Sequence, residues 1–325
     1  MKRLFQQIKR IASFWYVFMH DSIYYAKYSL NGYSLNCKND CMKAQMMLLL
    51  HALEKGMSFA HKKQDWGEKK AFALCKTIRE YAKNNDIDEY MILAISVLQK
   101  YSMDSSASKK QNLIADINAL VKTYSQYLFP QESVGIRKIQ EPPAFDKKQI
   151  EDFFSTRFSV RDFSNEPITK EEITSAMKIA NLTPTACNRQ TSKVYAIRNK
   201  DILKEVINHQ AGGQGWCENA DTLFLITGNQ SFFGGIWERE QIFIDGGLFA
   251  MNFVWGLHLN HIASCFKMFV RDISMQKKLN KLLDLPKNEV PIVVILAGHY
   301  KQEPVLGPYS HRFNHQCIYI DGKQQ

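Results

Sequence analysis

The chain has 325 residues, 45% of them hydrophobic and 23% charged, which is enough for two globular domains with sizeable cores. Its formal net charge of +10 favours an anionic partner such as a phosphate-bearing cofactor or a membrane, and the absence of long runs of like charge argues against nucleic acid. Seven scattered cysteines, without Cys-x-x-Cys or metal-ligand spacing, predict reduced thiols, no metal site and a cytoplasmic location.

The first third of the chain carries helical patterns and no strand pattern of comparable strength. Apolar residues recur at helical spacing over residues 4–18, with lysine and arginine off that stripe. Residues 1–18 could therefore contact a membrane surface, but the pattern alone favours a helix packed on its own domain. Further helices are predicted at residues 42–53, 67–83, 87–101 and 109–128. We recognise no signal peptide, and no apolar stretch approaches the roughly 18 residues of a membrane span.

A stretch with prolines, a glycine and little periodicity follows at residues 129–145 and predicts a linker. It divides the chain into a helical N-terminal domain, residues 1–140, and a second domain, residues 141–325. In the second domain predicted helices alternate with apolar strands, which is typical of an α+β or α/β fold. The helices are predicted at 146–154, 169–182, 201–209, 241–259 and 274–283, and the strands at 192–197, 222–227, 262–266 and 290–298.

One short segment of the second domain carries candidate ligand-binding side chains. Arg157, Ser159 and Arg161 alternate along it and share a face if the segment is extended. Two guanidinium groups and a hydroxyl suit a phosphate, which arginine binds through paired hydrogen bonds. Taken alone, the segment is better interpreted as a solvated strand edge, because such alternation is common. No Gly-x-Gly-x-x-Gly follows a strand, and no Walker or Gly-x-Ser-x-Gly motif occurs, so Rossmann, P-loop and α/β-hydrolase sites are not indicated.

Four segments of the second domain, in chain order, resemble the FMN-dependent nitroreductase family. They are residues 157–163 (Arg-Phe-Ser-Val-Arg-Asp-Phe), residues 183–190 (Thr-Pro-Thr-Ala-Cys-Asn-Arg-Gln), residues 245–252 with 263–265, and residues 291–300 with Arg312. The first is similar to the family's Arg-x-Ser-[Ile/Val]-Arg-x-[Phe/Tyr] entry segment, and the second to its Pro-Ser-x-x-Asn-x-Gln segment. The resemblance implies an α+β fold with a nitroreductase-like mixed sheet flanked by helices, preceded here by an all-α domain.

The resemblance also implies an activity. In the family, FMN accepts hydride from NAD(P)H at its N5 atom and passes it to a small organic acceptor, nitroaromatic or quinone-like in vitro, by a ping-pong mechanism. The flavin carries the chemistry, so no catalytic side chain is expected. The family's homodimer, with FMN at the subunit interface and each site built from both chains, is expected here as well.

The residues at the family's positions for the FMN phosphate and ribityl chain are Arg157, Ser159, Arg161 and Arg312. Each is expected to bind FMN through charge-assisted or hydroxyl hydrogen bonds. Arg161 is also expected to stabilise the negative charge of the reduced flavin.

The other expected cofactor-binding residues match the later segments. Asn188 matches the asparagine that hydrogen-bonds the flavin ring, Thr185 lies at the family's serine position, and Gln190 is nearby. The remaining three, in the third and fourth segments, are Ser264, Cys265 and Gly298.

Two alternatives come from features outside this pattern. Many family members have a lysine two residues before the final arginine, where this chain has Ser310. The N-terminal domain, through residues 54–58 and Trp66-Gly67, resembles helical extensions on nitroreductase-like proteins that are associated with surface-polysaccharide genes. The chain could therefore be a flavin-binding interaction module with reduced catalysis, linked to polysaccharide synthesis. A membrane or nucleic-acid binder acting through its basic surface is the other alternative.

Overall fold

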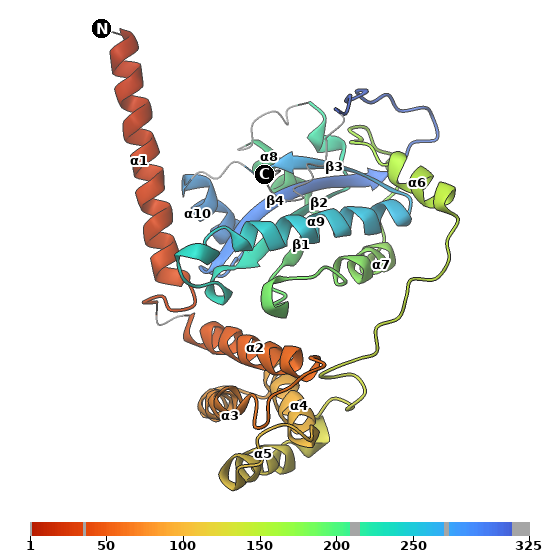
Figure 1. The fold of residues 1–325 in the computed structure, drawn as a ribbon. Coiled ribbons are helices and arrows are strands. Elements are labelled where there is room, and N and C mark those ends of the chain that lie inside the picture. Colours follow the sequence, from red (N-terminus) through yellow and green to blue (C-terminus); the bar gives the residue numbers. More distant parts are fainter. Residues whose placement is uncertain (1, 35–36, 209–214, 270–272, 314–325) are drawn as a thin grey trace, which may run out of the picture.

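The computed structural model describes residues 2–34, 37–208, 215–269 and 273–313, and Figure 1 shows their arrangement. Helices occupy the N-terminal region, and a sheet with flanking helices occupies the rest.

The helical region begins with a long helix that stands apart from the others (Figure 1). Its helices are α1 (Lys2–Tyr28), α2 (Lys38–Met57), α3 (Glu68–Ala82), α4 (Glu89–Met103) and α5 (Gln111–Thr123). Helices α2, α3 and α5 pack around α4, whose Met91, Ile95 and Leu98 are buried. Their apolar faces supply the core, since helices in globular proteins gain most of their stability from such packing. The helices predicted for this part of the chain are confirmed.

The second region is built on a four-stranded sheet. Its strands are β1 (Lys193–Ile197), β2 (Thr222–Asn229), β3 (Ile262–Met268) and β4 (Glu289–His299), in the spatial order β1-β2-β4-β3. All neighbouring strands pair antiparallel. Among the described residues, parallel pairing beside this sheet is limited to a single bridge between Ser159 and Ser264. The predicted strands are confirmed to within a few residues.

Both faces of the sheet are covered by helices. The helices of this region are α6 (Lys147–Ser155), α7 (Lys170–Ala180), α8 (Lys200–Asn208), α9 (Gln241–Leu259) and α10 (Ile273–Leu282). In β2, Phe224 and Ile226 pack with α7 and α9, whereas Leu223 and Leu225 pack with α8 and α10. Alternate residues of a strand point to opposite faces, which explains why β2 is an unbroken apolar run. The α+β prediction is confirmed.

No apolar stretch as long as a membrane span was expected from the sequence, and the central helix α9 corrects this expectation. The 24 residues Ile236–Leu259 are long and apolar enough to cross a membrane, and half of the apolar 18-residue window within them is buried inside the protein. Phe253, Val254 and Leu257 pack into the core between α7 and the sheet. The apolar character of α9 is thus accounted for by its position as a core helix.

The helical region and the sheet region share a core. Phe232, Phe233 and Val290 from the sheet region belong to the same buried cluster as α2–α5. A polar network reinforces this contact, because Asn288 Nδ2 donates to Asp40 Oδ2 at 2.7 Å and Asn229 Nδ2 donates to the same oxygen at 3.0 Å. A domain boundary near residue 140 stays a prediction.

Candidate functional site

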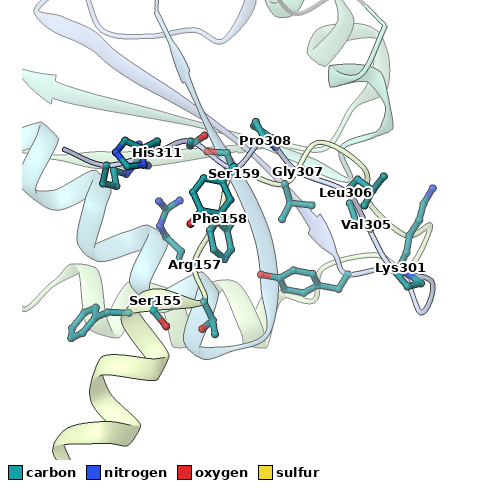
Figure 2. Close-up of a pocket in the computed structure, with 18 of the residues that line it drawn as sticks. Ser155, Arg157, Phe158, Ser159, Lys301, Val305, Leu306, Gly307, Pro308 and His311 are labelled. Carbon is teal, nitrogen blue, oxygen red and sulfur yellow. The ribbon is translucent and has the colours of Figure 1, made fainter. Parts of the chain in front are cut away.

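A cavity of about 1080 Å³ lies at the end of the sheet where β4 leaves it. One wall is residues 154–160, which run from the end of α6 into an extended segment, and the facing wall is residues 300–312, after β4. Figure 2 shows Ser155, Arg157 and Ser159 in succession along the first wall, with Lys301 and Val305–Pro308 on the second. Met251 and Trp255 of α9 also line the cavity.

Three of the ten predicted cofactor-binding residues line this cavity: Arg157, Ser159 and Arg312. Lys301 also lines it, but its ammonium group is paired with Asp162 at 2.6 Å. Within the described part of the chain, no carboxylate pairs with Arg157 or Arg312. Two guanidinium groups in a concave site give it a positive potential, which suits a phosphate or another small anion.

Arg161 lies elsewhere. Its guanidinium carbon is 5.5 Å from the ring centroid of Trp216, and the residue does not line the cavity. The backbone explains the difference, because the segment from Arg157 to Phe163 is tied to β3 at one point, through the Ser159–Ser264 bridge and the bond from Val160 N to Ser264 O at 3.0 Å, among the residues that the structure describes. Val160 and Phe163 are then both buried at a spacing of three, so strict alternation ends at Val160. The structure brings together Arg157 and Ser159 but not Arg161.

Aromatic residues also line the cavity. Trp255 packs edge-on against Phe154, with ring centroids 4.7 Å apart, and both line the cavity with Tyr300. Burial raises the pKa of Tyr300, with the nearby Arg157 acting in the opposite sense. The sequence reasoning missed Trp255. The signal that could have found it is its spacing of four from Met251, which places both side chains on one face of α9.

The predicted flavin-ring residues lie in a separate loop around η3 (Ala186–Asn188) and do not line the cavity of the same chain. Cys187, Asn188 and Gln190 have left-handed backbone conformations with φ of 53°, 53° and 50°. This conformation is unfavourable for residues other than glycine, and it persists where the surroundings enforce it. Thr185 contributes, since its Oγ1 accepts a hydrogen bond from Gln190 N at 3.1 Å. Asn188 and Gln190 are exposed.

A buried arginine holds this loop in place. Arg189 is 1% exposed, and its Nη2 lies 2.6 Å from Oε1 of Glu238. Its Nε also donates to Ala186 O at 2.9 Å, and its guanidinium carbon lies 4.7 Å from the ring centroid of Phe233. Burial alone would raise the pKa of Glu238, but hydrogen bonds from Arg189 and from Gly234 N keep it below its ordinary value.

The remaining predicted residues lie in strands β3 and β4 and pack against the segment that carries Ser159. Ser264 and Cys265 are buried in β3, and the carbonyl of Ser264 fixes the segment that carries Ser159. Gly298 lies at the end of β4, where a Cβ atom would be 2.6 Å from the Cβ of Phe163. The structure therefore gives Gly298 a packing role next to the cavity.

We expect Gly298→Ala to destabilise the protein by about 1–3 kcal/mol, the usual cost of overpacking a filled core. Gly247→Ala is the matched control, because a Cβ at this exposed helical position meets nothing within 4 Å. It should be neutral or stabilising, since alanine favours helix over glycine by about 1 kcal/mol. Urea unfolding midpoints of both variants provide the measurement, and equal shifts would contradict the packing role.

In the helical region, residues 54–58 and Trp66-Gly67, which carry the resemblance to helical extensions, lie close together. Trp66 packs on Gly56, where an added Cβ would lie 2.2 Å from the indole ring. The indole Nε1 donates to Ser106 Oγ at 3.2 Å, and Tyr101 Oη donates to the carbonyl of Trp66 at 2.6 Å. The Gly56 and Trp66 positions thus fix the loop between α2 and α3 against α4.

Comparison with known proteins gives matches in the second region. Residues 155–214 match the family model described as the nitroreductase family. This match begins at the arginine–serine wall of the cavity and extends through the η3 loop. A protein of Archaeoglobus fulgidus, provisionally named NADH dehydrogenase/NAD(P)H nitroreductase, is 25% identical over 173 residues, which cover 50% of this chain and 92% of that protein.

Solved structures give matches of similar extent. A provisionally named NADH dehydrogenase/NAD(P)H nitroreductase from Parabacteroides distasonis is 17% identical, with a TM-score of 0.45, and the match covers 54% of this chain and 98% of that one. An FMN-dependent nitroreductase from Clostridium difficile is 19% identical, with a TM-score of 0.42, and the match covers 50% and 98%. The resemblance to the nitroreductase family seen in the sequence is confirmed, and it extends over about half of the chain.

Proposed function

We propose that this protein is an FMN-dependent oxidoreductase that takes hydride from NAD(P)H and passes it to a small organic acceptor. The observation that carries the proposal is the cavity in which Arg157, Ser159 and Arg312 converge from segments about 150 residues apart. The family match over residues 155–214 and the names of the relatives support the same class of chemistry.

The residues of the cavity fit the phosphate end of FMN. Arg157 and Arg312 would hold the phosphate, and the hydroxyl of Ser159 would donate to it or to the ribityl chain. The volume of about 1080 Å³ is at the upper end of the range of small-molecule sites, which leaves room for a second ligand. FMN, when bound, supplies the hydride chemistry, and the chain supplies orientation and charge without a catalytic side chain.

Thr185, Asn188 and Gln190 would act from a second copy of the chain. These residues do not line the cavity of their own chain, and Asn188 and Gln190 are exposed. In a homodimer with the cofactor at the interface, the partner's loop would reach the flavin ring and the two chains would together exclude water. The ping-pong order of donor and acceptor follows if both stack in turn on one exposed ring face.

We place the enzyme in the cytoplasm. Six cysteines in the described part of the chain are free thiols, and Cys317 lies outside the described residues. Reduced thiols are usual in that compartment, where NAD(P)H is also supplied. We propose no nucleic-acid partner.

One observation favours the alternative of a flavin-binding module with reduced catalysis. Arg161, the expected stabiliser of the reduced flavin, packs on Trp216 and is absent from the cavity lining. Without a cation near the developing negative charge, hydride transfer would lose an electrostatic contribution. Such a module could serve in surface-polysaccharide synthesis, as the helical extension suggests.

An absorption spectrum of the purified protein, recorded before and after anaerobic addition of NADPH or NADH, tests these proposals. We expect a bound-flavin spectrum that bleaches on addition. Flavin that binds and stays oxidised would support the module instead. Failure to bind FMN after reconstitution would overturn the assignment of Arg157, Ser159 and Arg312.

A further inference from the structure

The first helix exposes nearly all of its apolar side chains. Ile8, Ile11 and Trp15 are 55%, 59% and 55% exposed, and every described side chain from residue 4 to residue 16 is exposed. The structure thus differs from the expectation that this helix packs on its own domain. Figure 1 shows α1 extending away from the rest of the protein.

The other end of α1 is firmly attached. Tyr24 Oη donates to the carbonyl of Lys287 and Tyr25 Oη donates to the carbonyl of Gly235, both at 2.8 Å. Just after the helix, Leu30 N donates to the carbonyl of Phe233 at 2.8 Å. The sheet region therefore fixes the base of α1, while the side chains of residues 4–16 remain exposed.

The exposed part of α1 is amphipathic. With about 100° between successive residues, the apolar side chains of residues 4–19 other than Val17 cover an arc of roughly 200°, with Trp15 near its centre and Gln7 as the one polar interruption. Lys9 and Arg10 lie on the opposite arc. Lys9 borders the apolar arc, where its Nζ lies 4.7 Å from the ring centroid of Phe5. Basic side chains at the edges of an apolar face can reach lipid phosphates while their stems stay in the apolar layer.

The charge of this segment is one-sided. Residues 1–20 contain four lysines and arginines and no aspartate or glutamate, and the first acidic residue is Asp21. An acidic or neutral partner is therefore favoured over a basic one. Tryptophan and phenylalanine on the apolar face are typical of helices that lie at the boundary between headgroups and acyl chains.

We propose that residues 4–19 of α1 lie in the plane of an anionic lipid bilayer and attach this protein to the membrane surface. The breadth of the apolar arc distinguishes this partner from a second copy of α1, because a coiled coil uses a narrow seam of two positions in seven. The proposal does not depend on flavin chemistry. In Figure 1, α6 and the adjacent cavity segments lie on the opposite side of the sheet from α1, so attachment leaves the cavity open to small molecules.

Vesicle co-sedimentation of the full chain tests the proposal. We expect binding to vesicles of phosphatidylglycerol and phosphatidylcholine in equal parts and much weaker binding to pure phosphatidylcholine. Binding should weaken in about 1 M salt, where electrostatic attraction is screened beyond roughly 3 Å. Lys9→Glu with Arg10→Glu should weaken binding by roughly tenfold or more, because each basic group near an anionic surface contributes about a factor of five.

Matched variants separate this helix from general surface effects. Trp15→Ser should reduce vesicle binding strongly, whereas Trp237→Ser should not, although Trp237 is even more exposed at 88%. Lys69→Glu with Lys70→Glu is the charge control, since both lysines are exposed on α3. Circular dichroism of each variant confirms that it is folded. The proposal is overturned if the wild type does not bind anionic vesicles, or if Trp15→Ser converts an oligomer into a monomer without changing vesicle binding.

Discussion

Replacing Arg157 or Arg312 with alanine is expected to weaken FMN binding by roughly 10- to 100-fold, whereas replacing Arg161 should change it by less than about threefold. Arg157 and Arg312 line the cavity and have no carboxylate partner within the described residues, while Arg161 packs on Trp216. A hydrogen bond to a charged group contributes about 1.5–3 kcal/mol, and each 1.4 kcal/mol corresponds to tenfold in affinity. The prediction assumes the proposed flavin site.

Fluorescence quenching of FMN on titration with the flavin-free protein measures these affinities. Arg161→Ala is the matched control, because the motif alone assigns Arg157 and Arg161 the same role and the structure does not. Arg157→Lys keeps the charge but loses the paired geometry, so it should recover only part of the affinity. If Arg161→Ala weakened binding and Arg157→Ala did not, the flavin site would lie on the Trp216 side of the segment.

The elements of the fold were largely predictable because their signals are local. The capping box formed by Thr169 and Glu172 is present at the start of α7, with Thr169 Oγ1 accepting from Glu172 N at 3.2 Å. The apolar run of β2 and the long apolar helix α9 are also visible in the sequence. A local pattern does not show what an element packs against. The prediction that α1 packs on its own domain was therefore wrong, because an apolar stripe has the same spacing whether the helix contacts protein or lipid.

The site was less predictable because its geometry depends on contacts far apart in sequence. Arg157 and Arg312 were assigned by resemblance, and their convergence depends on where β4 ends relative to α6. The orientation of Arg161 depends on a single bridge between Ser159 and Ser264, 105 positions further along the chain. Trp255 was missed because a tryptophan in a long apolar helix is usually a core residue.

The role of Arg189 was also invisible in the sequence, where it separates two expected flavin-binding residues, Asn188 and Gln190. The structure shows that it is the residue holding their loop. Arg189 joins the loop to Glu238, to the carbonyl of Phe232 and to the ring of Phe233. Phe232 and Phe233 in turn belong to the core shared with the helical region, so the loop is linked to both regions.

We expect Arg189→Ala to lower the free energy of unfolding by about 3 kcal/mol, the lower end of the range for breaking a buried ion pair, because Glu238 keeps some access to water. The left-handed residues of the loop should then relax, and flavin affinity should fall as well if the loop contributes to the site. Arg239→Ala is the matched control, since Arg239 pairs with Glu240 on the surface and should contribute less than about 1 kcal/mol. Urea unfolding of the two variants provides the comparison, and equal losses would contradict the role of Arg189.

The pH dependence of the same pair provides an independent check. Because Arg189 and Gly234 N keep the pKa of Glu238 below its ordinary value of 4.5, the native state binds a proton at this site less readily than the unfolded chain. The stability contributed by the pair is therefore complete above the ordinary value and is lost as the pH falls through the lowered one. Glu238→Gln removes this titration, so the difference in unfolding free energy between wild type and variant should be constant near neutral pH and shrink in acid. A difference that stays constant down to the acid transition would show that Glu238 does not stabilise the fold through its charge.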